Sequence, residues 1–253
     1  MRESIKVFAP ATVANVGCGY DVLGFALEGY GDELILTRRP DDRLVIASIE
    51  GVQGLPLDPL KNVSTAAINA LLTDLDLKQG FDLRIKKNIA AGSGLGSSAS
   101  SAAAAVYAAN EILGRPKSQL ELINYAMAGE KLASTKAHAD NVAPSILGGF
   151  TAVRSYEPLD VFNISYPESL KVVVIFPQIE IKTSDAKKIL RDEVKLTDAV
   201  KQWGNMAGLI SGLIEHDFER IGKSLQDVIV EPVRSILIPF YHQMKTLALK
   251  KGA

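Results

Sequence analysis

The residues from Asn88 to Ala105, NIAAGSGLGSSASSAAAA, have the composition of an anion-binding loop. Three glycines at positions 92, 94 and 96 precede a pair of serines, and an alanine-rich stretch follows. Glycine lets the backbone curve closely around an anion, and the free N–H groups and dipole of a helix N-terminus attract negative charge. A strand-like run, Phe81–Ile85, stands before the loop. The order of strand, glycine loop and helix therefore predicts a phosphate site in a nucleotide-binding protein.

This loop matches neither of the two common glycine fingerprints. A Walker loop closes with Gly-Lys-Ser/Thr, whereas Gly96 is followed by Ser97 and Ser98; a dinucleotide fingerprint needs a glycine at position 97. A flexible linker that leads into a closely packed helix is the alternative. The long buried-looking helix favours the anion site, because its first turn needs partners for unbonded N–H groups. The two serine hydroxyls could cap the helix or bind a phosphate or its magnesium ion.

The elements that must position this loop follow from the spacing of apolar residues. Strand-like runs are predicted at Ile5–Val7, Leu34–Leu36, Leu44–Ile49, Phe81–Ile85, Phe150–Arg154 and Lys171–Phe176, the last of them buried. Helices are predicted over Asn62–Leu75, Ser98–Leu113, Ser118–Ala133, Thr183–Leu190, Thr197–Ile214 and Ile236–Leu249. Strands and helices mix without strict alternation, which predicts an α+β fold. A domain junction is expected within Ser155–Ser169, where two prolines occur.

Composition limits the functional classes. The 253 residues are 47% hydrophobic and 23% charged, enough for one large domain or two modest ones. A net charge of −1 argues against a nucleic-acid or anionic-membrane partner. The single cysteine, Cys18, excludes an internal disulfide and CxxC-type metal sites. Neither a signal-peptide pattern nor an 18-residue apolar run is found, so a cytoplasmic protein is expected.

Four segments, in order, resemble the motifs of the GHMP small-molecule kinases. The loop NIAAGSGLGSSASSA is similar to the second family motif, and Ala9–Leu27 resembles the first motif in the form found in members that phosphorylate homoserine. A third match combines Glu130 with HADNVAP at 138–144 and a following Gly-Gly pair. Glu231–Arg234 resembles a later element of the homoserine-phosphorylating members. Together these segments extend over nearly the whole chain.

The resemblance implies a two-domain α+β fold. Residues 1–160 would form a ribosomal-protein-S5-domain-2-like N-terminal domain that carries the ATP loop, and residues 161–253 a ferredoxin-like C-terminal domain, with the acceptor alcohol between them. The chain ends about where the third glycine-rich motif of the family begins, so the C-terminal domain is expected to be truncated. An incomplete sheet exposes an unpaired edge and part of a core, which would favour either oligomerisation, for example as a homodimer, or instability.

The resemblance also implies ATP and Mg²⁺ as cofactors. The residues implied to bind the nucleotide are Asn62, Lys87, Ala91, Gly92, Ser93, Gly94, Leu95, Gly96, Ser97 and Ser98. Ser98 and Glu130 are implied as the two protein ligands of Mg²⁺, which suits an ion that keeps several waters and binds phosphate oxygens. Without the resemblance, Glu130 would be interpreted as a solvated helix residue and Lys87 as a solvated residue at a strand end.

On the acceptor side the resemblance implies L-homoserine as the small-molecule substrate. The residues implied to bind it are Asn15, Asp21, His138, Asn141, Thr183, Lys187 and Arg234. Asp21 suits the ammonium group, and Arg234 can hold the carboxylate through two hydrogen bonds. Lys187 stands where some relatives have arginine, and it keeps the charge without the planar fork. Taken singly, Asp21 would be a turn residue, His138 a core or capping histidine, and Arg234 a surface cation.

Asn141 bears on the mechanism. Seven residues before Gly148, mevalonate kinase and galactokinase have an aspartate that can act as a base, whereas this chain has Asn141, with Asp140 one residue out of register. An amide cannot take a proton at pH 7, so positioning and charge neutralisation would carry the catalysis. The expected reaction is ATP-dependent phosphorylation of L-homoserine to O-phospho-L-homoserine, in threonine biosynthesis. A GHMP kinase for another alcohol, and a nucleotide-binding chain with impaired turnover, stay open.

Overall fold

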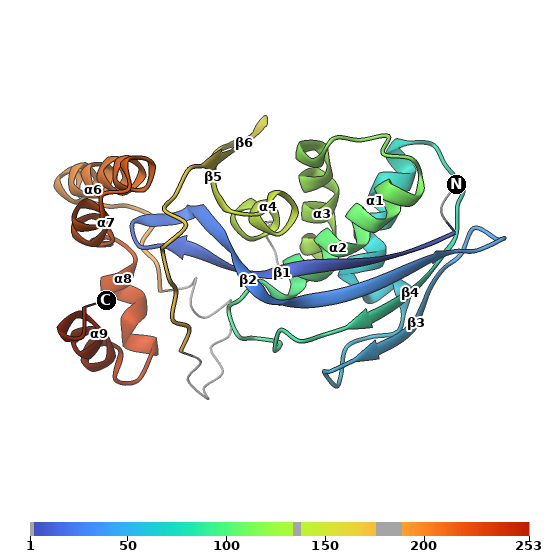
Figure 1. Cartoon of the computed structure of the whole chain (residues 1–253), viewed down its shortest axis with the longest axis horizontal. Helices are drawn as coiled ribbons and strands as arrows, with labels where there is room; N and C mark the ends of the chain where they lie inside the picture. The colour runs from blue at the N-terminus through green and yellow to red at the C-terminus, as the bar shows by residue number, and fades with distance from the viewer. Residues whose placement is uncertain (1–2, 134–137, 176–188, 253) are drawn as a thin grey trace. The chain divides into compact units, whose positions relative to one another are not determined.

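The computed structural model describes residues 3–133, 138–175 and 189–252 (Figure 1). The chain divides into two compact units. The first combines Met1–Ala14 with Asp21–Asn163, and the second combines Asn15–Tyr20 with Ile164–Ala253. The division into functional domains after residue 160 stays a prediction.

A six-stranded mixed sheet forms the frame of the first unit (Figure 1). Its strands are β1 (Ser4–Val16), β2 (Gly19–Arg38), β3 (Leu44–Glu50), β4 (Phe81–Lys86), β5 (Phe150–Tyr156) and β6 (Leu159–Ile164). The order is β3-β4-β2-β5-β6, and β1 pairs with β2 outside this path. β2 is antiparallel to β4, with Leu34 opposite Ile85 and Leu36 opposite Leu83, whereas β3 and β4 run parallel.

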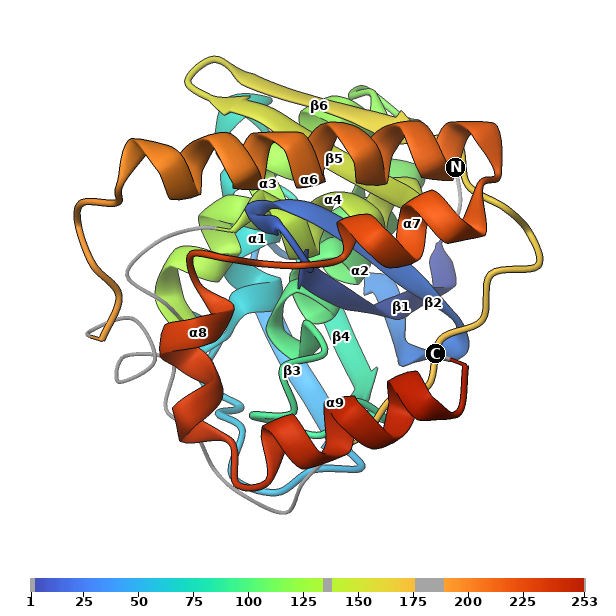
Figure 2. The same cartoon turned by 90° about the vertical axis from the view of Figure 1, so that its left-hand side faces the viewer.

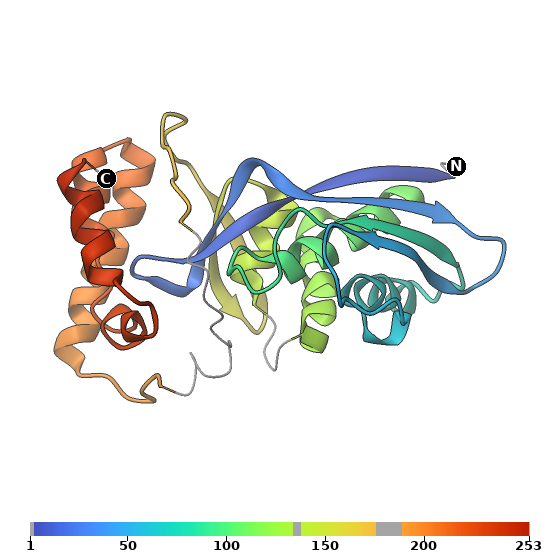
Figure 3. The same cartoon turned by 90° about the horizontal axis from the view of Figure 1, so that it is seen from below.

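Helices cover one face of this sheet (Figure 3). They are η1 (Pro59–Lys61), α1 (Val63–Asp74), α2 (Ser97–Ile112), α3 (Gln119–Ala133) and α4 (Ala139–Leu147). The predicted alternation in β4 is confirmed, because Phe81, Leu83 and Ile85 are buried in the core while Arg84 and Lys86 are exposed. A helix that is apolar on all sides must be buried on all sides, and the alanines of α2 are packed between α1 and α3.

Short side chains let the helices and strands approach closely. A Cβ atom at Gly129 of α3 would lie 2.5 Å from the carbonyl oxygen of Val63, and one at Gly24 of β2 would lie 1.8 Å from the carbonyl oxygen of Asp140. No residue larger than glycine fits at either contact. The approach at Gly129 brings α3 close to α1, and the approach at Gly24 holds α4, which carries Asn141, against the sheet.

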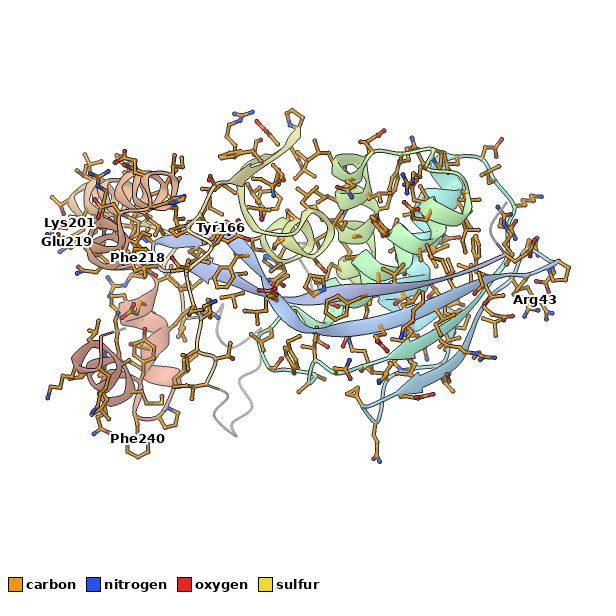
Figure 4. All side chains as sticks on the ribbon, in the orientation of Figure 1. Arg43, Tyr166, Lys201, Phe218, Glu219 and Phe240 are labelled. Atoms are coloured by element: carbon orange, nitrogen blue, oxygen red, sulfur yellow. The ribbon has the colours of Figure 1, made fainter. Side chains whose placement is uncertain are left out.

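The described residues of the second unit are mainly helical. The elements are α6 (Leu196–Glu215), α7 (Phe218–Ser224), α8 (Glu231–Arg234), η2 (Ser235–Leu237) and α9 (Tyr241–Lys250). Figure 2 shows α6 and α7 side by side, and Leu209 and Leu213 of α6 and Ile221 of α7 are buried. Other apolar side chains point outward, among them Phe218 and Phe240 (Figure 4), which are 50% and 72% exposed.

Several sequence predictions are corrected. The expected buried strand at Lys171–Phe176 is wrong, because residues 171–175 form no strand and Val173 is 86% exposed. A strand needs a hydrogen-bonded neighbour, and none of the described residues pairs with this run. The expected junction at Ser155–Ser169 holds the turn between β5 and β6 together with β6, and the boundary between the two compact units falls inside it, between Asn163 and Ile164. The last predicted helix begins five residues later, at Tyr241.

The predicted helices Asn62–Leu75, Ser98–Leu113, Ser118–Ala133 and Thr197–Ile214 are confirmed within two residues at each end. Of the predicted helix Thr183–Leu190, residues 183–188 lie outside the described part, and residues 189 and 190 are not helical. Helix α4 was missed, since Pro144 inside it is an unfavourable helix residue. Among the helices that the structure describes, none is long and apolar enough to cross a lipid bilayer.

Candidate functional site

A cavity of about 360 Å³ lies in the first unit at the N-terminus of α2. Every residue that the sequence predicted for the nucleotide lines it except Leu95, and so do Glu130 and Asn141. Ile49, Leu55 and Val63 add an apolar wall that the sequence analysis did not assign. Residues from β3, α1, the glycine loop, α3 and α4 are therefore brought together around one space.

The glycine loop has a backbone shape that other residues adopt only with strain. Gly92, Gly94 and Gly96 have φ of +74°, +75° and +67°. A Cβ atom at either of the first two would meet open space, whereas one at Gly96 would lie 2.1 Å from the hydroxyl of Thr12. Gly96 is thus required for two reasons, its backbone angle and its contact with β1.

Helix α2 begins without a side-chain cap. Gly96 occupies the N-cap position, so no capping side chain bonds to the N–H groups of the first turn, and that turn contains no acidic residue. The first helical bond runs from the Ser100 N–H to the Gly96 carbonyl at 2.8 Å. N–H groups ahead of this bond and the helix dipole point toward the cavity, which suits a polyphosphate.

Two of the predicted nucleotide residues support the cavity walls instead of offering free polar groups. The Ser97 hydroxyl donates to the carbonyl oxygen of Ile89 at 3.0 Å, which ties the start of the loop to its end. The Asn62 side chain caps α1, accepting from the Ser64 N–H at 2.9 Å and donating to the carbonyl of Pro56 at 3.3 Å. Their predicted direct contact with ATP stays a prediction.

A buried ion pair lies under the loop. The Lys87 ammonium contacts Asp32, and it donates to the carbonyl oxygen of Ser97 and the hydroxyl of Ser101, each at 2.7 Å. The second Asp32 oxygen accepts the N–H groups of Asn88 and Ile89 at 2.8 and 3.0 Å. Burial lowers the pKa of Lys87, and the charge of Asp32 opposes that shift. Lys87 therefore holds the loop and helix together, and Asp32 is a residue that the sequence analysis missed.

Ser98 and Glu130 meet at the cavity wall, where the serine hydroxyl donates to the glutamate carboxylate. Burial raises the pKa of Glu130, and the bond from Ser98 opposes this effect. Among the described residues, no group of three His, Cys, Asp or Glu side chains could hold a metal. One hydroxyl and one carboxylate side by side do fit Mg²⁺, because that ion takes its other ligands from water and phosphate.

Asn141 stands in the first turn of α4 and lines the same cavity. Its Oδ1 accepts a hydrogen bond from the hydroxyl of Thr12 at 2.8 Å.

The neighbouring Asp140 is 1% exposed and does not line the cavity, and its Oδ1 has no hydrogen-bond partner among the described residues. Burial raises the pKa of Asp140 to about 6; the charge of His138 opposes the rise and that of Asp21 adds to it.

Besides Asn141, which lines the first cavity, the residues predicted for homoserine fall into three groups. In the first unit, His138 Nδ1 lies 3.5 Å from an Asp21 carboxylate oxygen. In the second unit, Asn15 and Arg234 line another cavity, of about 610 Å³, where the guanidinium lies 5.9 Å from the centroid of the Tyr20 ring. Thr183 and Lys187 lie outside the described residues.

Comparisons with known proteins give consistent results. Residues 62–149 match the model of the family described as GHMP kinases N terminal domain. The homoserine kinase of Chlorobium phaeovibrioides is 46% identical over 99% of this chain and 82% of its own length, and that of Methanococcus maripaludis is 37% identical over 96% and 80%. A crystal structure of homoserine kinase from Cytophaga hutchinsonii, 49% identical, covers all of this chain and 81% of that one with a TM-score of 0.95.

The expected α+β fold is confirmed by these likenesses. A crystal structure of mevalonate kinase, 17% identical, covers 87% of this chain and 76% of its own with a TM-score of 0.62. At this identity the likeness concerns the fold alone.

We predict that Lys87→Met lowers the free energy of unfolding by about 3–5 kcal/mol, because it leaves the Asp32 charge buried without its counter-ion. Lys86→Met is the matched control, since Lys86 is exposed and its pair with Glu33 is 3.6 Å long. That variant should change the free energy by about 1 kcal/mol or less. Urea unfolding measures both; equal losses would contradict the role given to Lys87.

The buried Asp140 should make stability depend on pH. Its folded pKa of about 6 exceeds the unfolded value of 3.8, so its contribution to stability is complete below the unfolded pKa and is lost as pH rises through about 6. We predict that Asp140→Asn raises Tm by about 5 °C at pH 8 and by about half as much at pH 5. The exposed Asp42→Asn should change Tm equally at both values of pH. A pH-independent effect of Asp140→Asn would contradict this assignment.

Proposed function

Because the chain belongs to the homoserine kinases of the GHMP kinase family, we propose that it is an ATP:L-homoserine O-phosphotransferase. It would transfer the terminal phosphoryl group of ATP to the hydroxyl of L-homoserine, giving O-phospho-L-homoserine for threonine biosynthesis. The observation that carries this proposal is the cavity where the glycine loop, the Ser98–Glu130 pair and Asn141 meet. The cytoplasmic location and the homodimeric state of the protein remain predictions.

The nucleotide half of the proposal depends on backbone groups. The N–H groups at the start of α2 would bind the phosphates of ATP, and the Lys87–Asp32 pair would keep the loop in shape around them. The apolar wall of Ile49, Leu55 and Val63 suits the base of a nucleotide. Ser98 and Glu130 would hold Mg²⁺, which when bound neutralises charge on the phosphates.

The acceptor half depends on charge complementarity. Homoserine carries an ammonium, a carboxylate and a primary hydroxyl. We assign the ammonium to Asp21, which His138 orients from 3.5 Å, and the carboxylate to Arg234, whose fork matches two oxygens. Asn15 lines the same cavity as Arg234 and would add a polar contact. Thr183 and Lys187 stay predicted contributors.

The transfer itself would proceed without a dedicated base. The hydroxyl oxygen of homoserine attacks the terminal phosphorus, and the O–P bond forms while the bond to the bridging oxygen of ADP breaks. The hydroxyl proton leaves late, to a phosphate oxygen or water. Asn141 cannot take the proton, and Asp140 is buried away from the cavity. Positioning and charge neutralisation therefore lower the barrier.

Coupled-enzyme measurement of ADP release tests the substrate. With Mg²⁺ and ATP, we expect turnover with L-homoserine and background rates with mevalonate and galactose. Turnover with mevalonate or galactose and none with homoserine would reject the proposal in favour of another alcohol kinase. Tight binding of a fluorescent ADP analogue with no turnover on any of the three would support the nucleotide-binding alternative.

Asp140→Asn tests the mechanism. Loss of a general base lowers kcat by about 10²–10⁴-fold, so this variant should keep kcat within about tenfold of the wild type. Asn141→Ala, at the next position, should lose more than tenfold, because Asn141 faces the cavity. An Asp140→Asn variant that folds and binds ATP normally but has no turnover would identify Asp140 as the base.

A further inference from the structure

We propose that Thr12 is a positioning residue that fixes which end of the Asn141 amide faces the reacting atoms. Thr12 belongs to the strand β1 and lies within Ala9–Leu27, the segment that resembles the first family motif, but it is not among the residues that the sequence predicted for the site. The inference rests on the proposed function for its chemistry, while the contact between the two side chains can be tested without any substrate.

Thr12 lies between the glycine loop and α4. Its side chain is fully buried, its N–H donates to the carbonyl of Leu95 at 3.1 Å, and its hydroxyl donates to Asn141 Oδ1 at 2.8 Å. A Cβ atom at Gly96 would lie 2.1 Å from the same hydroxyl oxygen. Thr12 therefore contacts the loop and Asn141 at once, where β1, the start of α2 and the start of α4 come together (Figure 1).

The hydroxyl of Thr12 meets the oxygen end of the Asn141 amide. An asparagine side chain has a carbonyl oxygen that accepts and a nitrogen that donates twice, while a threonine hydroxyl can donate one proton and can also accept. Here that proton is given to Oδ1, which also lies 2.9 Å from the Cβ position of Gly96. The amide nitrogen has no hydrogen-bond partner among the described residues, and Asn141 lines the cavity. Asn141 thus offers a donor to whatever fills that space.

A donor is the useful group for a transfer without a base. When the amide N–H binds one lone pair of the acceptor hydroxyl oxygen, the second lone pair is free to attack phosphorus. The hydroxyl proton is then also free to pass to a phosphate oxygen as the O–P bond forms and ADP leaves. A reversed amide would instead accept the hydroxyl proton in a hydrogen bond without being able to remove it.

Thr12→Val removes the hydroxyl and keeps the shape, so it tests the orientation. We expect kcat with homoserine to fall about 10–100-fold while the Kd for ADP stays within threefold, because the effect is on the reacting atoms and not on nucleotide binding. Thr12→Ser restores the donor and should recover kcat to within threefold. Thr151→Val is the control: Thr151 is equally buried, and its hydroxyl donates to the carbonyl of Gly24 at 3.3 Å, outside the cavity.

A double-mutant cycle shows whether Thr12 acts through Asn141. In the Asn141→Ala background, Thr12→Val should lower kcat by less than twofold, since the group that it orients is already gone. A further tenfold loss in that background, equal losses in Thr12→Val and Thr12→Ser, or a wild-type kcat in Thr12→Val would each overturn the proposal.

The same cycle measured on thermal unfolding needs no substrate. Thr12→Val alone leaves the half-buried Asn141 side chain without the donor to its carbonyl oxygen, whereas the double variant removes both partners, so the loss of Tm should be smaller than the sum of the single losses. Additive losses would overturn the contact between Thr12 and Asn141. A wild-type chain inactive on homoserine with non-additive losses would instead reject the proposed function and leave the contact in place.

Discussion

The buried pair of Lys87 and Asp32 is the interaction on which the site depends. Two charges removed from water are stable only when their remaining hydrogen-bonding capacity is satisfied. Here the Lys87 ammonium donates to the carbonyl oxygen of Ser97 and the hydroxyl of Ser101, both in α2. The Asp32 carboxylate accepts hydrogen bonds from two consecutive N–H groups at the start of the loop. One pair of side chains thereby joins β2, the end of β4, the loop and the first turn of α2. The uncapped N–H groups of that turn keep their direction because of it.

Burial affects two carboxyl groups of the first unit, Glu130 in the cavity wall and Asp140 outside it. It raises the pKa of both, because it disfavours the charged form of each group. A cation beside Glu130 would favour its charged form, which links the proposed Mg²⁺ to the ionisation of its ligand. Asp140 does not line the cavity, and its Oδ1 has no hydrogen-bond partner in the described part of the chain, so its environment differs from that of Asn141 although the two are adjacent in the chain.

Much of the first unit could be predicted from local patterns. Spacing alone predicted β4 and α2. In β4 the alternating apolar residues Phe81, Leu83 and Ile85 can all be buried only as a strand, and the alanine-rich run after the loop can be buried as a helix. The apolar run at 171–175 has no such constraint. It resembles a buried strand in composition. A strand forms only where another strand supplies its hydrogen bonds, and the local sequence does not predict whether such a partner is present.

The sequence by itself determined the loop, its glycines and the residue types of the site, because a phosphate-binding backbone needs glycine at fixed spacing and each motif is local. Only the tertiary structure decided how the polar groups are used. Ser97, Asn62 and Lys87 bond to the protein around the cavity, and Asn141 is oriented by Thr12, 129 positions away in the chain. A hydrogen bond forms where the fold brings donor and acceptor together, and the separation of two residues along the chain does not predict whether they meet.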